Sequence, residues 1–298
     1  MANNTLHESV LKKEVIKYLS PKPNENFIDA TFNGGGHSLE IFKKTFPRGK
    51  ILGIELDKEL LEKTRKRLKQ FEKRLVLVND NFKNLKRIVE NHDFKNISGV
   101  IFDLGFSSWH IEESKKGFSF QKNEILDMRY GDKGIKAIDI LNKWQEEDIE
   151  RILREYGEER FSRKIAKAII SARREKPIIK TFELVEIIKK IIPFQRKIHP
   201  ATRTFQALRI AVNDEIGNIK SALPQALEVL KLQGRIVVIS FHSLDDRIVK
   251  NYFKEEKNKG EIEILTKKPI KPTNEEIKNN PRSRSARLRA VKKLIAKN

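Results

Sequence analysis

Apolar runs alternate with amphipathic segments over the first part of the chain. The apolar runs predict short buried strands at residues 27–31, 51–55, 75–78 and 100–104. Between them, apolar side chains recur three or four positions apart, which predicts helices near residues 8–19, 38–46, 58–71 and 85–91. Strands that alternate with helices in this way form a parallel sheet with helices on both faces. Right-handed crossovers bring the carboxyl ends of the strands to one edge, where ligands bind.

The pattern changes after residue 106. Residues 107–213 show helical periodicity, for example at 149–156, 161–172 and 182–191, and no good strand. A long helix over 208–230 then leads to a strand at 235–241, and the last strands are expected at 262–265 and 288–291, separated by a polar loop at 267–280. The expected fold is therefore α/β, a mostly parallel sheet with an inserted helical subdomain. The sheet domain takes residues 1–106 and 214–298, and the insert takes residues 107–213.

A glycine-rich turn joins the first predicted strand to the next helix, in the sequence DATFNGGGHS at residues 29–38. Glycines let the backbone approach a ligand closely, and the start of a helix offers unbonded N–H groups. The turn lacks the Gly-x-Gly-x-x-Gly spacing of dinucleotide sites, which weakens a nicotinamide interpretation. A tight structural turn is the plainer alternative, but three successive glycines favour a binding role.

Two acidic residues follow predicted strands. Glu55 ends the second strand and lies 55 − 36 = 19 residues after Gly36, close to the ~20 residues expected of an acid that binds ribose hydroxyls. Asp103 ends the fourth strand and could hold a cofactor or accept a proton from a substrate. A solvated carboxylate is the alternative for Glu55, and helix capping is the alternative for the serines that follow Asp103.

The composition favours a polyanionic partner and excludes thiol chemistry. The 62 Lys and Arg residues exceed the 41 Asp and Glu residues, giving a net charge of +21. Such an excess is typical of nucleic-acid binding, although a lysine-rich surface adapted to heat is possible on composition alone. The chain has no cysteine, which rules out disulfides, thiolate zinc sites and a cysteine nucleophile, and no metal is implied. It has no apolar run of ~18 residues and no signal-like start at Met1–Asn4, so a cytoplasmic location is expected.

Three polar motifs supply candidate RNA contacts. Arg203 belongs to HPATRTFQALR at residues 199–209, and His242 belongs to SFHSLDDR at residues 240–247. Arg282 and Arg284 open the run RSRSARLR, whose even spacing would line one face with guanidinium groups if the segment were extended. A solvated or salt-bridged surface is the alternative for the arginines, and the aspartates after His242 could simply cap a helix.

The ordered set of motifs resembles a known family. The segments that carry the resemblance are GGHS (35–38), DLGFSS (103–108), GFSF (117–120), LDMR (126–129), YGEERF (156–161), HPATRTFQA (199–207), SFHSLDDR (240–247) and NPR (280–282). Together they are similar to the bacterial ribosomal RNA small subunit methyltransferase H family, whose members are 16S rRNA cytosine-N4 methyltransferases. The match runs in order from about His7 to about Leu294.

The resemblance implies a class I methyltransferase fold, S-adenosyl-L-methionine as cofactor, and N4 methylation of a cytosine in the decoding region of 16S rRNA. By position, it implies these cofactor contacts: Gly35, Gly36, His37, Glu55, Phe82, Asp103 and His110. Glu55 stands where the family usually has Asp, which keeps the carboxylate but lengthens its reach. His110 stands where Gln is common.

Two other functions are compatible with such a sheet. A nicotinamide-dependent oxidoreductase would bind that cofactor and transfer no methyl group; the glycine spacing and the basic charge disfavour it. A ribosome-associated binding or assembly protein would bind rRNA without a small cofactor; the glycine turn paired with Glu55 disfavours it.

Overall fold

The computed structural model describes residues 9–192 and 199–294. The chain divides into two compact units, one formed by residues 1–107 with 216–298 and the other by residues 108–215. The first residue of the predicted helix near 8–19, the segment Met1–Asn4 and His7 lie outside the described residues. In the part of the chain that is described, no helix is both long and apolar enough to cross a membrane.

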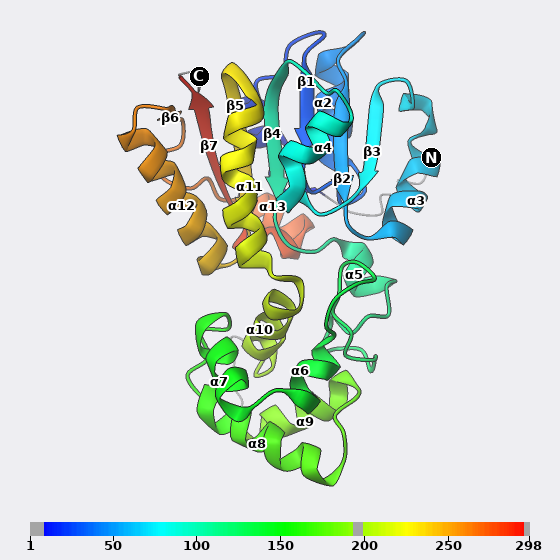
Figure 1. The fold of residues 1–298 in the computed structure, drawn as a ribbon, viewed down its shortest axis with the longest axis vertical. Coiled ribbons are helices and arrows are strands. Elements are labelled where there is room, and N and C mark those ends of the chain that lie inside the picture. The colour runs from blue at the N-terminus through cyan, green and yellow to red at the C-terminus, as the bar shows by residue number, and fades with distance from the viewer. Residues whose placement is uncertain (1–8, 193–198, 295–298) are drawn as a thin grey trace. The chain divides into compact units, whose positions relative to one another are not determined.

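The first unit contains a seven-stranded sheet in the order β3-β2-β1-β4-β5-β7-β6 (Figure 1). Its parallel strands are β1 (Asn26–Asp29), β2 (Ile51–Glu55), β3 (Leu75–Asn79), β4 (Ile97–Asp103) and β5 (Leu230–Ser240). The antiparallel pairs join β7 (Arg287–Lys293) to β5 and to β6 (Ile262–Ile264). The chain leaves β1 toward β2 and β3 on one side, and β4 and β5 follow on the other, so the switch in strand order lies between β1 and β4.

Alternating side chains build a core on each face of this sheet. Phe27 packs in the cluster that includes α1 (Lys12–Leu19) and α2 (Gly36–Thr45). Its neighbour Ile28 packs in the opposite cluster, with α4 (Leu85–Asn91), α11 (Glu215–Val229) and α12 (Ser243–Asn258). Each fully buried side chain of this size stabilises the fold by about 1.5–3 kcal/mol, and the three layers hold the strand ends rigidly in place. The other elements of this unit are α3 (Lys58–Arg67), η1 (Lys69–Phe71), η2 (Phe82–Asn84), α13 (Asn274–Asn279) and η3 (Pro281–Ser285).

The second unit is helical and has a core of its own. Its helices are α5 (Ser108–Glu112), α6 (Ala137–Lys143), α7 (Glu146–Glu155), α8 (Ser162–Glu175), α9 (Thr181–Ile191) and α10 (Thr202–Asn213). Apolar side chains at helical spacing, such as Ile149, Ile152 and Leu153 of α7, form the inner face of each helix. Among the described residues of this unit, the strand-type pairing is a single bridge between Ile125 and Lys180.

Two details of the predicted fold are wrong, and the condition set for the arginine run is met only in part. The long helix expected at 208–230 is two helices, because Asp214 adopts a left-handed conformation (φ 47°) that ends α10 before α11 begins. The loop expected at 267–280 contains α13, whose start is capped by the Thr273 hydroxyl at 3.2 Å from Glu276 N. The arginine run is not extended throughout, because residues 281–285 form the short helix η3 before β7 begins.

Candidate functional site

Three buried carboxylates lie at the carboxyl ends of neighbouring strands. Asp29 ends β1, Glu55 ends β2 and Asp103 ends β4, and the three are 1%, 6% and 2% exposed. Because β2, β1 and β4 are adjacent and parallel, their carboxyl ends share one edge of the sheet, at the switch in strand order. Burying three carboxylates is costly unless they are hydrogen-bonded or bind a ligand.

The bend after β1 is attached to the ends of both neighbouring strands through Asn33. The Asn33 backbone N–H donates to Oε2 of Glu55 at 3.0 Å, and its side-chain amide donates to the backbone oxygen of Asp103 at 3.1 Å. One asparagine therefore ties β2 to β4 across β1. The bend requires positive φ angles at three consecutive residues: 43° at Asn33, 89° at Gly34 and 77° at Gly35. Asn and Gly are the residues that adopt this conformation most readily.

Close packing also restricts the bend. A Cβ atom at Gly35 would lie 2.7 Å from Cζ of Phe32, closer than real side-chain contacts. The guanidinium of Arg67, at the end of α3, donates to the Gly34 carbonyl. Helix α2 begins at Gly36, and its N-cap residue, Gly35, has no side chain to cap the helix. The positive end of α2 therefore lies beside the carboxylates, in the position where helix N-termini bind negatively charged groups.

His37 and Asp103 form a buried pair at this edge. Nε2 of His37 lies 3.5 Å from Oδ2 of Asp103, and Nδ1 of His37 has no hydrogen-bond partner among the described residues. The Asp103 backbone N–H donates to the Thr31 hydroxyl at 2.6 Å, which fixes the end of β4 against the bend. A buried imidazole nitrogen without a protein hydrogen-bond partner is available to bind a polar group of a ligand.

Burial raises the pKa of two of the carboxyl groups. For Glu55 it raises the pKa from 4.5 to about 7, with the Asp57 carboxylate adding to the rise and the N–H groups of Asp57 and Asn33 opposing it. For Asp29 burial raises the pKa from 3.8 to about 7, and the hydrogen bond donated by the Ser38 hydroxyl (2.7 Å) opposes the rise. Such raised pKa values arise because the folded protein keeps these carboxyl groups away from water. Carboxyl groups of this kind are common at functional sites.

The other two predicted cofactor residues lie in different surroundings. Phe82 is in η2, directly after β3, and its ring packs edge-on against Phe102 of β4 at 5.8 Å. His110 belongs to the second unit, where its buried ring makes edge contacts with Phe118 (5.2 Å) and Tyr130 (5.0 Å). The structure thus brings Gly35, Gly36, His37, Glu55 and Asp103 together on the first unit, and a role for His110 toward the cofactor stays a prediction.

The candidate RNA residues of the first unit lie near the end of β5 and at the start of β7. Nδ1 of His242 accepts the Asp245 N–H at 3.4 Å as the N-cap of α12, and its Nε2 lies 2.9 Å from Oδ2 of Asp245. Arg282 and Arg284 are exposed on η3. The later arginines of the same run do not form a free face, because Arg287 and Arg289 both bind Asp246, at 3.3 and 2.7 Å.

The candidate RNA residue of the second unit, Arg203, lies on α10. Its guanidinium donates to the Glu158 carbonyl at 3.0 Å and lines a hollow of about 210 Å³ together with Arg160. Arg209, further along the same helix, forms a bidentate salt bridge with Glu215 at 2.7 and 2.9 Å. The salt-bridged alternative therefore holds for Arg209.

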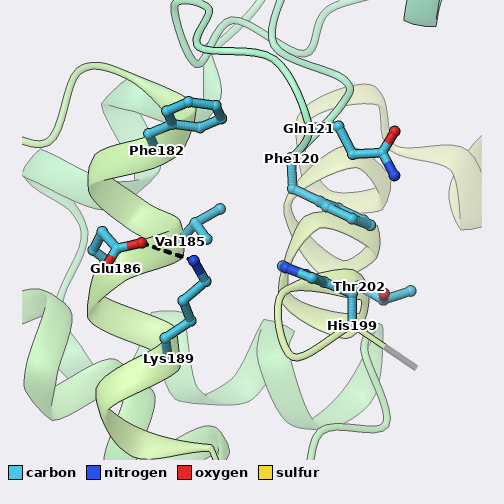
Figure 2. Close-up of a pocket in the computed structure, with 8 residues that line it drawn as sticks. All are labelled: Phe120, Gln121, Phe182, Val185, Glu186, Lys189, His199 and Thr202. Carbon is cyan, nitrogen blue, oxygen red and sulfur yellow. Dashed lines mark hydrogen bonds and ion pairs between the residues drawn. The ribbon is translucent and has the colours of Figure 1, made fainter. Parts of the chain in front are cut away.

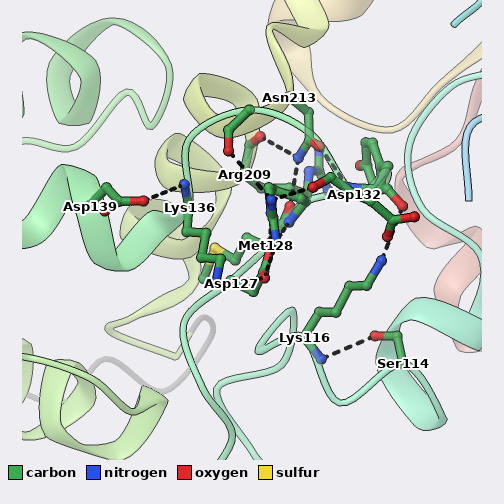
Figure 3. A network of polar contacts seen from close by, with 12 residues as sticks. Ser114, Lys116, Asp127, Met128, Asp132, Lys136, Asp139, Arg209 and Asn213 are labelled. Atoms are coloured by element: carbon green, nitrogen blue, oxygen red, sulfur yellow. Dashed lines mark hydrogen bonds and ion pairs between the residues drawn. The ribbon is translucent and has the colours of Figure 1, made fainter.

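The motif at residues 126–130 has an internal structural role (Figure 3). Asp127 binds the Arg129 guanidinium at 2.7 and 2.8 Å. Asn213 holds the turn by donating to the Met128 carbonyl and accepting the Tyr130 N–H, both at 2.8 Å. The Tyr130 hydroxyl donates to Glu215 at 2.8 Å. These contacts fix the end of α10 to the loop at residues 126–130, inside the second unit.

The second unit also has an aromatic groove of about 650 Å³ (Figure 2). Phe182 and Lys189 of α9 line one side, and Phe120 and His199 line the other. The rings of Phe120 and His199 are stacked, with centroids 4.4 Å apart and planes 4° apart. This groove was not predicted from the sequence, although Phe120 and His199 both fall in motifs that carry the family resemblance.

Comparison with known proteins identifies the family. A family model described as the MraW methylase family matches residues 4–294. This chain belongs to the MraW methylase family. It is 46% identical to a ribosomal RNA small subunit methyltransferase H of Sulfurihydrogenibium sp., over 97% of this chain and 99% of that one. It is 47% identical to the protein of the same name in Dictyoglomus thermophilum, over 96% of each chain. Among solved structures, a rRNA methylase from Streptococcus thermophilus aligns with a TM-score of 0.45 and 12% identity, over 95% of this chain and 94% of that chain.

Membership in the MraW methylase family confirms the resemblance inferred from the motifs. The mostly parallel seven-stranded sheet confirms the predicted α/β fold. Asn33 was not predicted as a site residue. The one local feature of the sequence that could have drawn attention to Asn33 is its place directly before glycines, because asparagine readily adopts the positive φ angle that it has here.

Proposed function

We propose that this protein transfers a methyl group from S-adenosyl-L-methionine to N4 of a cytosine in the decoding region of the 16S rRNA of the small ribosomal subunit. Family membership and relatives named for small subunit rRNA methylation support this assignment. The observation that carries it is the attachment of the glycine bend, through Asn33, to the strand ends that bear Glu55 and Asp103.

The residues at this edge fit a sulfonium nucleoside. The Asn33 N–H donates to Oε2 of Glu55 and the Asp57 N–H donates to its Oε1, and the carboxylate has further lone pairs that can accept ribose hydroxyls. The uncapped start of α2, at Gly35 and Gly36, suits the carboxylate of the methionine part. Nδ1 of His37 offers a polar contact inside the same site. Asp103, Phe82 and His110 complete the set that we assign to the cofactor.

Asp103 is the catalytic residue in this proposal. The bound cofactor supplies a methyl group that is already activated by its sulfonium. Cytosine N4 is a poor nucleophile because its lone pair is delocalised into the ring, so the site must accept N–H bonds and align N4. The Asp103 backbone N–H donates to the Thr31 hydroxyl, which holds the residue in place. In this proposal the Asp103 carboxylate accepts the N–H bonds of the amino group, aligns N4 and takes up its proton. The target base must be single-stranded or leave its stack to reach the site.

In this proposal the sheet unit binds the cofactor, and both units contact the rRNA. Of the assigned RNA contacts, Arg203 belongs to the helical unit, and His242, Arg282 and Arg284 belong to the sheet unit. The charge of +21 favours the phosphate backbone as partner. We place this activity in the cytoplasm, where small ribosomal subunits are assembled.

A transfer assay tests the proposal. The protein is incubated with S-adenosyl-L-methionine carrying a labelled methyl group and with small subunits that lack the modification. The rRNA is then digested and its nucleosides are analysed by mass spectrometry. We expect the label in N4-methylcytidine. Label in another nucleoside, or binding of subunits without any transfer, would contradict the proposal.

A further inference from the structure

Helix α8 presents a basic face to solvent. Its exposed cations are Arg163, Lys164, Lys167 and Arg174, whereas Ile165, Ala166 and Ile169 are buried. At 100° per residue, the four cations fall within an arc of about 100° on the side opposite the core. With a rise of 1.5 Å per residue they extend for about 16 Å along the helix.

The α8 cations differ from those of the neighbouring helix in their acidic partners. On α7, Arg151 pairs with Asp148 at 2.9 Å and Arg154 pairs with Glu150 at 3.3 Å. No ion pair is formed by the four α8 cations within the described ranges 9–192 and 199–294. Like charges four positions apart, as at Arg163 and Lys167, destabilise a helix by a few tenths of a kcal/mol. A bound polyanion would offset the repulsion within such a stripe.

The basic face continues beyond the start of α8. Arg160 precedes the helix and lines the hollow of about 210 Å³ with Arg203 of α10. Glu159 also lines this hollow, but its carboxylate accepts the Phe161 N–H at 2.9 Å. Two arginines thus line one small hollow, and arginine side chains suit phosphate oxygens, although the Arg203 guanidinium also donates to the Glu158 carbonyl.

The hollow adjoins the aromatic groove of Figure 2, because His199 lines both. Phe182, at the rim of this groove, is 44% exposed although its side chain is apolar. Phosphate-binding cations beside exposed aromatic rings are typical of proteins that bind single-stranded nucleic acid, since bases stack on the rings. A double helix would leave the rings unused.

We infer that the α8 cations, the Arg160–Arg203 hollow and the aromatic groove form one binding surface for single-stranded RNA. The cations bind successive phosphates, and Phe182 stacks on an unpaired base. That this strand belongs to the methylated rRNA rests on the proposed function. The surface itself involves only the second unit and none of the residues assigned to the cofactor or to catalysis, and of the RNA contacts assigned above it includes only Arg203.

Salt dependence tests the phosphate contacts. Binding of the full-length protein to a labelled single-stranded RNA 20-mer is measured over a series of KCl concentrations. In Arg163→Gln/Arg174→Gln we expect affinity to fall roughly 20-fold near 0.1 M salt, and the log–log salt slope to decrease by about 1.4. The control Arg151→Gln/Arg154→Gln removes the same charge from α7, and its affinity and slope should stay near wild type. Equal losses in both variants, or no loss in the α8 variant, would overturn the inference.

The aromatic contact has a different signature. Phe182→Ala should weaken binding of the single strand by about 5- to 150-fold while leaving the salt slope unchanged, since stacking releases no counterions. Binding of a matching RNA duplex should be the same in Phe182→Ala and wild type. Retained single-strand affinity in this variant would remove the groove from the surface. Circular dichroism confirms that each variant is folded.

The two proposals fail differently. If the proposed function is wrong, the wild-type protein transfers no methyl group to rRNA, whatever the RNA-binding result. If the inference is wrong, wild type transfers the methyl group and the α8 and Phe182 variants bind RNA as wild type does. Affinity for S-adenosyl-L-methionine should be unchanged in all of these variants.

Discussion

The backbone N–H of Asn33 lies 3.0 Å from Oε2 of Glu55 and donates a hydrogen bond to it. Glu55 thereby holds the glycine bend with one oxygen while the other oxygen accepts the Asp57 N–H at 2.9 Å. The carboxylate that we assign to the ribose is thus positioned by the turn that we assign to the rest of the cofactor.

Cofactor affinity should depend on pH through Glu55. Ribose hydroxyls need the ionised carboxylate as acceptor, and burial raises the Glu55 pKa to about 7. Affinity should therefore fall as the group becomes protonated, with a dissociation constant about 10-fold higher at pH 6 than at pH 8. Calorimetric titrations with S-adenosyl-L-methionine between pH 5.5 and 8.5 measure this. Asp29→Asn, which removes the other carboxyl with a pKa of about 7, should keep the profile; a flat profile in wild type would contradict the role of Glu55.

Removing the buried charge of Asp29 should stabilise the fold at alkaline pH. Because burial raises its pKa from 3.8 to about 7, folded Asp29 binds its proton more tightly than unfolded Asp29. The stability that the tighter proton binding of folded Asp29 contributes is fully present below pH 3.8. It is lost as the pH rises through about 7. This difference in pKa corresponds to roughly 4 kcal/mol in the free energy of unfolding. The new amide in Asp29→Asn forms imperfect hydrogen bonds, so the variant should be more stable than wild type by only about 1–2 kcal/mol at pH 8.

Urea unfolding of wild type and Asp29→Asn at pH 5 and pH 8 checks this. The difference in the free energy of unfolding should be larger at pH 8 than at pH 5. A difference that grows toward acid pH would show that the folded state binds the Asp29 proton more weakly than the unfolded state, the reverse of the expected order.

Replacing Gly35 by alanine should damage the bend more than its φ angle alone explains. Gly35 (φ 77°) and Gly260 (φ 75°) have nearly the same conformation, but a Cβ meets Phe32 at the first and open space at the second. Gly260→Ala should cost about 1 kcal/mol from backbone strain. Gly35→Ala adds overpacking and should cost about 3 kcal/mol, with loss of cofactor binding. Thermal unfolding of both variants is the measurement, and equal losses would show that the contact with Phe32 is unimportant.

Asp103→Asn should lose most activity while the fold survives. The substitution keeps the size of the side chain and the backbone contact with Thr31, but removes the group that accepts the N4 proton. General base catalysis contributes about 10²–10⁴-fold, so turnover should fall by that factor. Turnover with small subunits, together with the melting temperature, separates the two effects. Near-wild-type turnover would remove Asp103 from the chemistry.

Local sequence patterns predicted the elements that position the site. The predicted bounds of β2 match those observed, because its residues 51–54 carry no polar side chain, are buried, and lie between the charged residues Lys50 and Glu55. Glu55 and Asp103 could be placed at one sheet edge because strand ends of a parallel sheet always converge there. The break at Asp214 was missed because the apolar pattern continues across it from α10 into α11.

Contacts between distant residues could not be predicted from one sequence. Asp246 of α12 binds Arg287 and Arg289 of β7. Two arginines of the run that was predicted to bind phosphates therefore form ion pairs within the protein. The bridging role of Asn33 depends on hydrogen bonding across two strands, which leaves no periodic signal. The same holds for the groove between Phe182 and His199, whose walls are brought together only by helix packing.

Calorimetric titration with S-adenosyl-L-methionine at pH 8 tests the central claim most directly. Wild type and Glu59→Ala, which changes an exposed acid on α3, should both show one saturable binding event. Glu55→Ala removes two charged hydrogen bonds to the ribose and should bind at least about 30-fold more weakly. If folded wild-type protein produces no binding heat, with or without RNA present, or if Glu55→Ala binds as wild type does, the strand ends do not form the cofactor site.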